Sequence, residues 1–189
     1  CMSNLKQHGQ GLQFYTLNNN DNMAFANSKY DNSAWQDWVN RGLGNNDLGG
    51  AKKWWDFAIF FCPTQNTMYP DGYNAYVRGY GQSPSISYYD KVTKIVRIQT
   101  PSQALWISEL RNGLADRQPW RLGWPNKAHV EKYLGGSWKD NSTGYCHNSR
   151  VNVLYVDGHV APHERWLKDN LSLFRLWPGF KLDWETTAL

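Results

Sequence analysis

The sequence has no hydrophobic run long enough to cross a membrane. Spanning a bilayer takes about 20 consecutive apolar residues, and no segment of the 189 residues approaches that length. The apolar core of a secretory signal is also missing. We therefore expect the chain as it stands to be soluble. It opens at Cys1 and not at an initiator Met, so we also expect an upstream segment in the native protein.

Clustered charge of one sign is missing as well. The 20 basic and 16 acidic residues give a net charge of +4 and are scattered along the whole chain. Proteins that bind nucleic-acid phosphates gather Lys and Arg on one face. The scattered pattern instead predicts a solvated surface and no nucleic-acid partner.

Short catalytic motifs are absent too. The sequence contains no G-x-S-x-G, HExxH, P-loop or GxGxxG pattern, so nothing indicates a serine hydrolase, a zinc protease or a nucleotide-binding enzyme. Carboxylates that glycan hydrolysis would need are available at Glu109, Asp116, Asp157 and Glu164. That reaction requires two carboxyl groups at a defined separation across a cleft, and scattered carboxylates are usually solvated. We predict that the chain is not an enzyme, with a glycan hydrolase as the enzymatic alternative.

Cysteine is scarce. Cys1, Cys62 and Cys146 are the three in the chain, and their spacings match neither a zinc ribbon nor a CxxC redox motif. Two interpretations stay open. Outside the cytoplasm one disulfide is plausible, with Cys62 and Cys146 as its candidate pair. Three buried thiols fit the sequence equally well.

A β-hairpin is the clearest structural signal that the sequence does contain. Residues 151–156 are rich in β-branched and aromatic side chains, and Asp157-Gly158 supplies the positive φ angles of a tight turn. Apolar side chains occupy both the odd and the even positions of this segment. We therefore predict an interior strand that is covered on both faces.

Helical spacing marks the first 18 residues. One stripe recurs every three or four positions and consists of Leu5, His8, Leu12 and Tyr15. Gly9 and Gly11 weaken the helix by about 1 kcal/mol each relative to Ala, so packing must hold it. The Asn and Asp residues at 18–22 predict the helix end, because their side chains bond nearby backbone and tolerate left-handed conformations.

Shorter elements are expected along the rest of the chain. They are a helix at 33–39 closed by Gly42, an extended segment at 54–62 with a helix ending before Pro63 as the alternative, strands at 86–89 and 104–108, a turn of helix within 88–98, an irregular excursion at 111–142 and a short helix at 164–170. A long helix followed by strands with mixed connections predicts an α+β fold. The length and composition predict a single domain over residues 1–189.

The hairpin also carries a recognisable spacing. His147, nine further residues and then Asp157-Gly158 resemble the H-x9-DG signature of prepilin-like proteins related to the type II secretion pseudopilins. The opening residues CMSNLKQ are similar to the segment that follows the hydrophobic helix in those proteins. Three landmarks between the two ends occur in the expected order. They are Phe61-Cys62-Pro63, Gly72-Tyr73-Asn74 and Thr100-Pro101-Ser102.

This resemblance implies a pilin-like fold, in which a spine helix, truncated here to residues 1–20, packs on an antiparallel sheet of a globular head at 21–189 with long irregular loops. It implies a structural or assembly protein at the periplasmic side or cell surface. The missing N-terminal hydrophobic helix would anchor it in the inner membrane and bundle with other pilin-like subunits. His147, Asp157 and Gly158 would then have a structural role, with His147 bonded to a backbone carbonyl or to Asp157.

Two kinds of metal site can be considered. His147, Asp157, His159 and His163 lie within one hairpin and are suitable zinc ligands, but strand side chains alternate faces and turn geometry explains Asp157. Calcium is suggested because major pseudopilins carry it in a loop, and residues 45–47 and 139–141 offer oxygen ligands here. We expect no cofactor, with calcium as the one candidate, and leave other metal ligands undefined.

The chain is rich in tryptophan, with 11 residues. Tryptophan is highly buried on average, so packing is the favoured explanation. The alternative is a carbohydrate-binding surface module, since exposed indoles stack on sugar rings. Its candidate residues are Trp54, Trp55, Trp120, Trp124 and Trp138. Glycan is therefore a second candidate partner.

Overall fold

The computed structural model describes residues 1–24, 35–44, 57–64, 80–83, 86–88, 91–109, 147–148 and 150–164. Two α-helices, α1 (Met2–Asn18) and α2 (Trp35–Gly42), precede the strands. Two 3₁₀ helices are η3 (Ala58–Phe60) and η5 (Ile95–Arg97). The strands are β1 (Tyr80–Gln82), β2 (Ser87–Tyr88), β3 (Lys91–Val92), β4 (Leu105–Glu109), β5 (Arg150–Tyr155) and β6 (Val160–Glu164). The predicted α+β class is confirmed.

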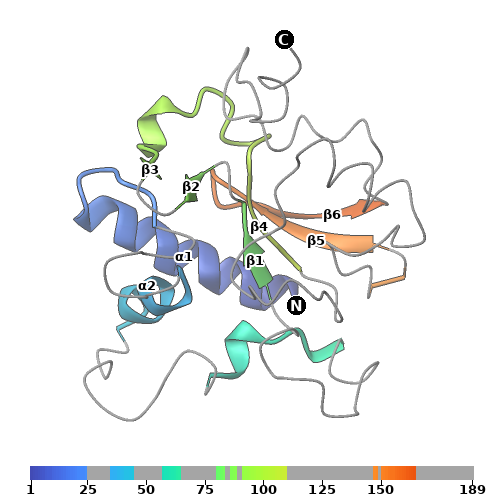
Figure 1. Cartoon of the computed structure of the whole chain (residues 1–189). Coiled ribbons are helices and arrows are strands. Elements are labelled where there is room, and N and C mark those ends of the chain that lie inside the picture. Colours follow the sequence, from blue (N-terminus) through green and yellow to red (C-terminus); the bar gives the residue numbers. More distant parts are fainter. Residues whose placement is uncertain are drawn as a thin grey trace.

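A four-stranded antiparallel sheet in the order β1-β4-β5-β6 forms the scaffold. In β5 every residue after Arg150 is buried, and the strand lies between β4 and β6 (Figure 1). The predicted interior strand is therefore confirmed. β2 and β3 form a separate two-stranded sheet.

The loop between β5 and β6 differs from the predicted two-residue turn. Only Gly158 of the Asp157-Gly158 pair has a positive φ, of 92°. The Tyr155 amide donates to the His159 carbonyl at 3.0 Å, while the Val156 amide turns to the Ala104 carbonyl beside β4 at 3.0 Å. This attachment to the neighbouring strand widens the loop. Asp157 caps it, because its Oδ1 accepts from the His159 amide at 3.1 Å.

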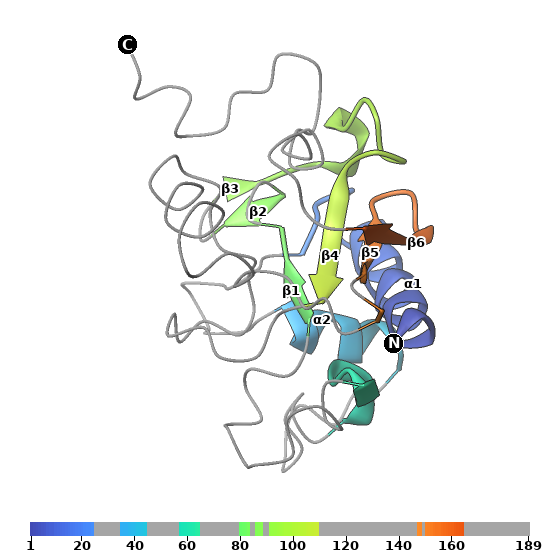
Figure 2. The same ribbon diagram turned by 90° about the vertical axis from the view of Figure 1, so that its right-hand side faces the viewer.

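Helix α1 packs on one face of the sheet, against β5 and β6 (Figures 1 and 2). Leu5, His8 and Leu12 of the predicted stripe are completely buried. The helix ends where predicted, since Asn20 and Asp21 adopt left-handed φ angles of 53° and 62°. Among the described residues, no helix combines the length and the apolar character needed to span a bilayer.

Helix α2 approaches α1 so closely that their backbones touch. A Cβ added to Gly11 would lie 2.8 Å from the Val39 carbonyl oxygen, and one added to Gly42 would run into the backbone of Gly11. Gly11, one of the two glycines that weaken the helix, is therefore required by the close approach of α2. A Cβ added to the other, Gly9, would lie 3.0 Å from the Leu154 side chain of β5. The predicted helix at 33–39 is confirmed as α2, although its first residues lie outside the described part.

Several smaller expectations need correction. Within the segment 54–62, residues 58–60 form η3 and not extended backbone, while Phe57 and Phe61 on either side are extended. Strand β1 was not predicted. The strands at 86–89 and 104–108 correspond to β2 and β4, and the turn of helix within 88–98 is η5. Glu164 ends β6, and the remainder of the predicted helix 164–170 lies outside the described residues, as does the excursion 111–142.

Candidate functional site

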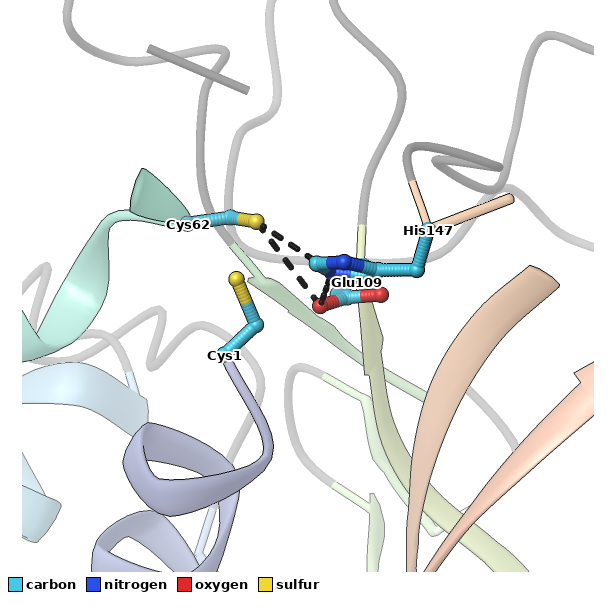
Figure 3. A group of neighbouring side chains, drawn as sticks. All are labelled: Cys1, Cys62, Glu109 and His147. Atoms are coloured by element: carbon cyan, nitrogen blue, oxygen red, sulfur yellow. Dashed lines mark hydrogen bonds and ion pairs between the residues drawn. The ribbon is translucent and has the colours of Figure 1, made fainter. Parts of the chain in front are cut away.

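Four side chains that carry metal-binding or nucleophilic atoms meet at one end of the two central strands of the sheet. Cys1 precedes α1, Cys62 follows η3, Glu109 ends β4 and His147 precedes β5. One sulfur, nitrogen or oxygen atom from each lies within 4.8 Å of the other three. Figure 3 shows the Cys62 sulfur directed towards the imidazole and the carboxylate, and the Cys1 sulfur on the same side of them as Cys62.

Glu109 is held rigidly within this group. It is fully buried at the end of β4, opposite Tyr80 of β1. Its Oε2 accepts from the Asn152 backbone amide at 2.8 Å and from the Asn152 side-chain amide at 3.3 Å. Its Oε1 accepts from the same side chain at 3.1 Å. Asn152 of β5 therefore fixes the plane of the carboxylate and aims Oε1 at the other members of the group.

His147 is positioned by a tight turn just before β5. Asn148 has a φ of 50°, and His147 and Arg150 exchange backbone hydrogen bonds of 3.3 and 3.0 Å. The imidazole Nε2 lies 2.8 Å from Glu109 Oε1 and 3.6 Å from Cys62 Sγ. The prediction that His147 bonds Asp157 or a backbone carbonyl is wrong, because its side chain faces β4 and Glu109.

The two cysteines arrive on segments that are tied together. The Asn4 side-chain amide donates to the Phe61 carbonyl at 3.0 Å, which links the first turn of α1 to the residue before Cys62. Cys62 is buried, with Sγ 3.8 Å from Glu109 Oε1. Cys1 is partly buried, and its Sγ lies 3.8 Å from the Thr64 hydroxyl. Both thiols therefore lie on the same side of the carboxylate.

This geometry does not suit a cysteine nucleophile. In a thiol-imidazole-acid relay, one ring nitrogen takes the thiol proton while the other is held by the acid. Here Cys62 and Glu109 both face the same nitrogen, Nε2 of His147. The four atoms are grouped within 4.8 Å of one another, which is close enough for all of them to contact one ion.

The histidines and the aspartate of the hairpin do not converge on one metal. Asp157 Oδ1 contacts His159 Nδ1 at 2.6 Å, His163 bonds the Tyr155 hydroxyl, and His147 belongs to the group with Glu109. The Tyr155 ring stacks on His159 with centroids 4.2 Å apart. Burial, followed by the negative charge of Asp157, raises the pKa of Tyr155 to about 12. Burial and then the neighbouring His159 lower the pKa of His163.

Other predicted sites lie outside the described residues. They are the five candidate sugar-stacking residues Trp54, Trp55, Trp120, Trp124 and Trp138, the calcium loops at 45–47 and 139–141, and Cys146 of the candidate disulfide. These stay predictions. Asp157 and Gly158 lie in the loop between β5 and β6.

Gly158 gives a test of this loop. Gly158→Ala should lower the free energy of unfolding by about 1 to 2 kcal/mol, because an L residue at a φ of 92° is strained. The added Cβ would also meet the Gln13 side-chain amide at 2.5 Å, but that flexible group can move away. Urea unfolding measures the loss. Gly158→Asn should lose less, because Asn tolerates positive φ, and equal losses for both variants would contradict a strain-based origin.

Comparisons of the chain with protein-family models, with curated proteins and with solved structures gave no match.

Sequence reasoning missed the group of four because its members are separated by dozens of residues and form no short motif. One signal was available. Cys1, Cys62 and His147 each lie in a segment that stands out in the sequence, and these three segments meet in space. Glu109 had been considered only as a carboxylate for hydrolysis, and it instead bonds His147 and Asn152.

Proposed function

We propose that this chain is the extracytoplasmic head of a pseudopilin-like assembly subunit with a pilin-like fold. The observation that carries the proposal is the packing of α1 on an antiparallel sheet whose interior strand belongs to the hairpin with the H-x9-DG spacing. A helix packed on an antiparallel sheet is the arrangement that a pilin-like spine would require, and it supports the proposal.

The proposed action is mechanical and needs no catalysis. A hydrophobic helix ahead of α1 anchors the subunit in the inner membrane and bundles with the helices of other pilin-like subunits. The heads then decorate the assembly at the periplasmic side or cell surface, where they contact neighbours or cargo. Such a subunit therefore acts by binding neighbours or cargo through the surface of its head.

The outward face of α1 supports contacts of this kind. Phe14 and Leu17 lie one turn apart on the helix and are 58% and 75% exposed. Single exposed apolar side chains are common on soluble proteins. Phe14 and Leu17, however, are neighbours on the helix that would continue the spine. They are therefore suited to packing against a neighbouring subunit.

Mass spectrometry of the N-terminal peptide tests the proposal directly. The full-length native protein would be recovered from membrane fractions. We expect a hydrophobic helix upstream of Cys1 with a methylated first residue, left after a short leader has been removed. A conventional signal-peptide scar directly before Cys1 would contradict the pilin-like assignment and favour the glycan-binding alternative.

A paired substitution on α1 tests the contact face. Phe14→Ser with Leu17→Ser in the full-length protein should sharply reduce cross-linking between copies in membranes. The isolated head should keep its free energy of unfolding within about 0.5 kcal/mol, since both side chains are exposed. Lys6→Ser with Gln10→Ser, also on exposed positions of α1, is the matched control. An equal effect of the two pairs would argue against an apolar subunit contact.

No observation on the described residues favours glycan binding or hydrolysis. Trp35 and Trp106 are fully buried, and Trp38 lies against Tyr15 with Arg41 4.3 Å over its ring. Tryptophan fluorescence would test the alternative on the rest of the chain. A spectral shift with oligosaccharides would favour it, and a blue spectrum that iodide does not quench would favour packing.

A further inference from the structure

We propose that Cys1, Cys62, Glu109 and His147 bind a single zinc ion in a structural, four-coordinate site. The inference is independent of the assembly function proposed above. It starts from the chemistry of the donors, because thiolates and imidazole are preferred zinc ligands and a carboxylate oxygen is an accepted one. All four donor atoms lie within 4.8 Å of one another.

The two separations from the Cys62 sulfur match those around a tetrahedral ion. Zinc bonds of about 2.3 Å to sulfur and about 2.0 to 2.1 Å to nitrogen or oxygen place a sulfur roughly 3.6 Å from either of the lighter donors. Cys62 Sγ lies 3.6 Å from His147 Nε2 and 3.8 Å from Glu109 Oε1. The nitrogen and the oxygen are 2.8 Å apart, and they must separate by roughly 0.6 Å to reach tetrahedral positions.

The charge of the site also favours a cation. Glu109 is completely buried, and a buried carboxylate needs a compensating positive charge. Among its partners in the described part of the chain, only His147 can supply one, and only when protonated. A zinc ion compensates the carboxylate and both thiolates while leaving the imidazole neutral. The two thiols release their protons to solvent on binding.

A supporting shell is already in place. Asn152 holds Glu109 Oε2 through its backbone and side-chain amides, so Oε1 is directed at the other donors. Hydrogen bonds of this kind orient metal ligands and are worth about 10-fold to 100-fold in affinity. Four protein ligands leave no open position, which is the pattern of a structural site.

The test uses the reduced chain, with zinc and cobalt(II) as probes. We expect one zinc per chain by mass-spectrometric metal analysis and by titration against a chromophoric chelator. Cobalt(II) should give the visible absorption of a tetrahedral ion together with a near-ultraviolet thiolate band. Failure of the reduced wild-type chain to bind zinc stoichiometrically, or a cobalt spectrum without thiolate character, would overturn the proposal.

Variants locate the ligands. Cys62→Ser and His147→Gln should each weaken zinc binding by more than about 100-fold, and Asn152→Ala by about 10-fold to 100-fold. Glu109→Gln keeps the shape of the side chain and should also weaken binding. His159→Gln is the matched control, since His159 contacts a carboxylate on the same hairpin but not the thiols. Circular dichroism verifies that each variant is folded. The cobalt spectrum of the wild-type chain tests the site even if a variant does not fold.

Two further outcomes would refute the site. An effect of His159→Gln as large as that of His147→Gln would show that zinc binds through the hairpin histidines. A disulfide that consumes Cys1 or Cys62 in protein isolated from its native compartment would remove a thiolate ligand and would refute the site. Alkylation and peptide mapping of that protein distinguish this result from the free-thiol form that zinc binding requires.

Discussion

Gly42→Ala should destabilise the protein by about 3 kcal/mol. The added Cβ would run into the backbone of Gly11, and backbone in a packed helix cannot rotate away as a side chain can. Overpacking of a core usually costs about 1 to 3 kcal/mol, and a backbone obstacle lies at the upper end. Alanine's better helix propensity returns at most about 1 kcal/mol. The clash therefore outweighs the gain in helix propensity, and the variant is less stable. Urea unfolding followed by circular dichroism measures the loss of stability.

The matched control is Gly44→Ala, two residues further along. A Cβ there meets nothing within 4 Å, but Gly44 has a φ of 83°, so only backbone strain of about 1 to 2 kcal/mol is expected. Gly42→Val should be more damaging than Gly42→Ala, because it adds bulk at the same obstacle. Equal losses at positions 42 and 44 would show that the helices separate at little energetic cost.

Acid should destabilise the protein through His8. The ring is fully buried, stacked on Phe60 at 5.1 Å and met edge-on by Trp35 and Tyr80. Burial lowers the pKa of His8 from 6.5 to about 3, and the hydrogen bond to the Ile59 carbonyl opposes this only partly. Nε2 carries the proton, because it lies 2.9 Å from that carbonyl oxygen. No described group bonds Nδ1, which would receive the second proton.

The sign of the pH effect follows from which state binds the proton. Below pH 6.5 the unfolded chain protonates His8, whereas the folded chain does so only near pH 3. The stability contributed by the neutral ring is complete above about pH 7 and is lost as the pH falls through this window. Between pH 7.5 and pH 5 the loss is about 2 kcal/mol.

His8→Phe should remove this acid sensitivity while keeping an aromatic ring in the stack. It should also cost about 1 kcal/mol at neutral pH, because the Ile59 carbonyl loses its donor. The measurement is urea unfolding at pH 7.5 and pH 5. Leu12→Val, on the same buried stripe, should lower stability by about 1 kcal/mol at both values. If the free energy of unfolding of His8→Phe falls as much between pH 7.5 and pH 5 as that of the wild type, His8 is not the source of the acid sensitivity.

The same residue shows what sequence could and could not predict. Helical spacing identified His8 as part of a buried stripe, since periodicity reports which face of a helix is covered. It could not reveal the ring's neutral state, because that depends on aromatic neighbours contributed by three other segments. The β5–β6 hairpin was predictable for a similar reason, since β-branched residues and a glycine turn are local signals.

Elements that depend on distant contacts were missed. Strand β1 has three residues, including Gly81, and its pairing with β4 stabilises it, so the local sequence gives little signal. In the same way, Cys62 and Glu109 gain their significance only from the packing of η3 beside the end of β4. Spacing along the chain could exclude a zinc ribbon but could not exclude a site assembled from separate segments.

The dispersal of the four donor residues has a consequence for biosynthesis. The contacts of Glu109 with Cys62 and His147 close intervals of 47 and 38 residues, so the cluster cannot form before His147 has been made. At roughly 5 to 20 residues per second of translation, Cys1 is made on the order of ten seconds before His147. Throughout that time its thiol lacks the other three members of the group, and it becomes partly buried once the group has assembled. Pulse alkylation of Cys1 would therefore time the assembly of this group on the nascent chain.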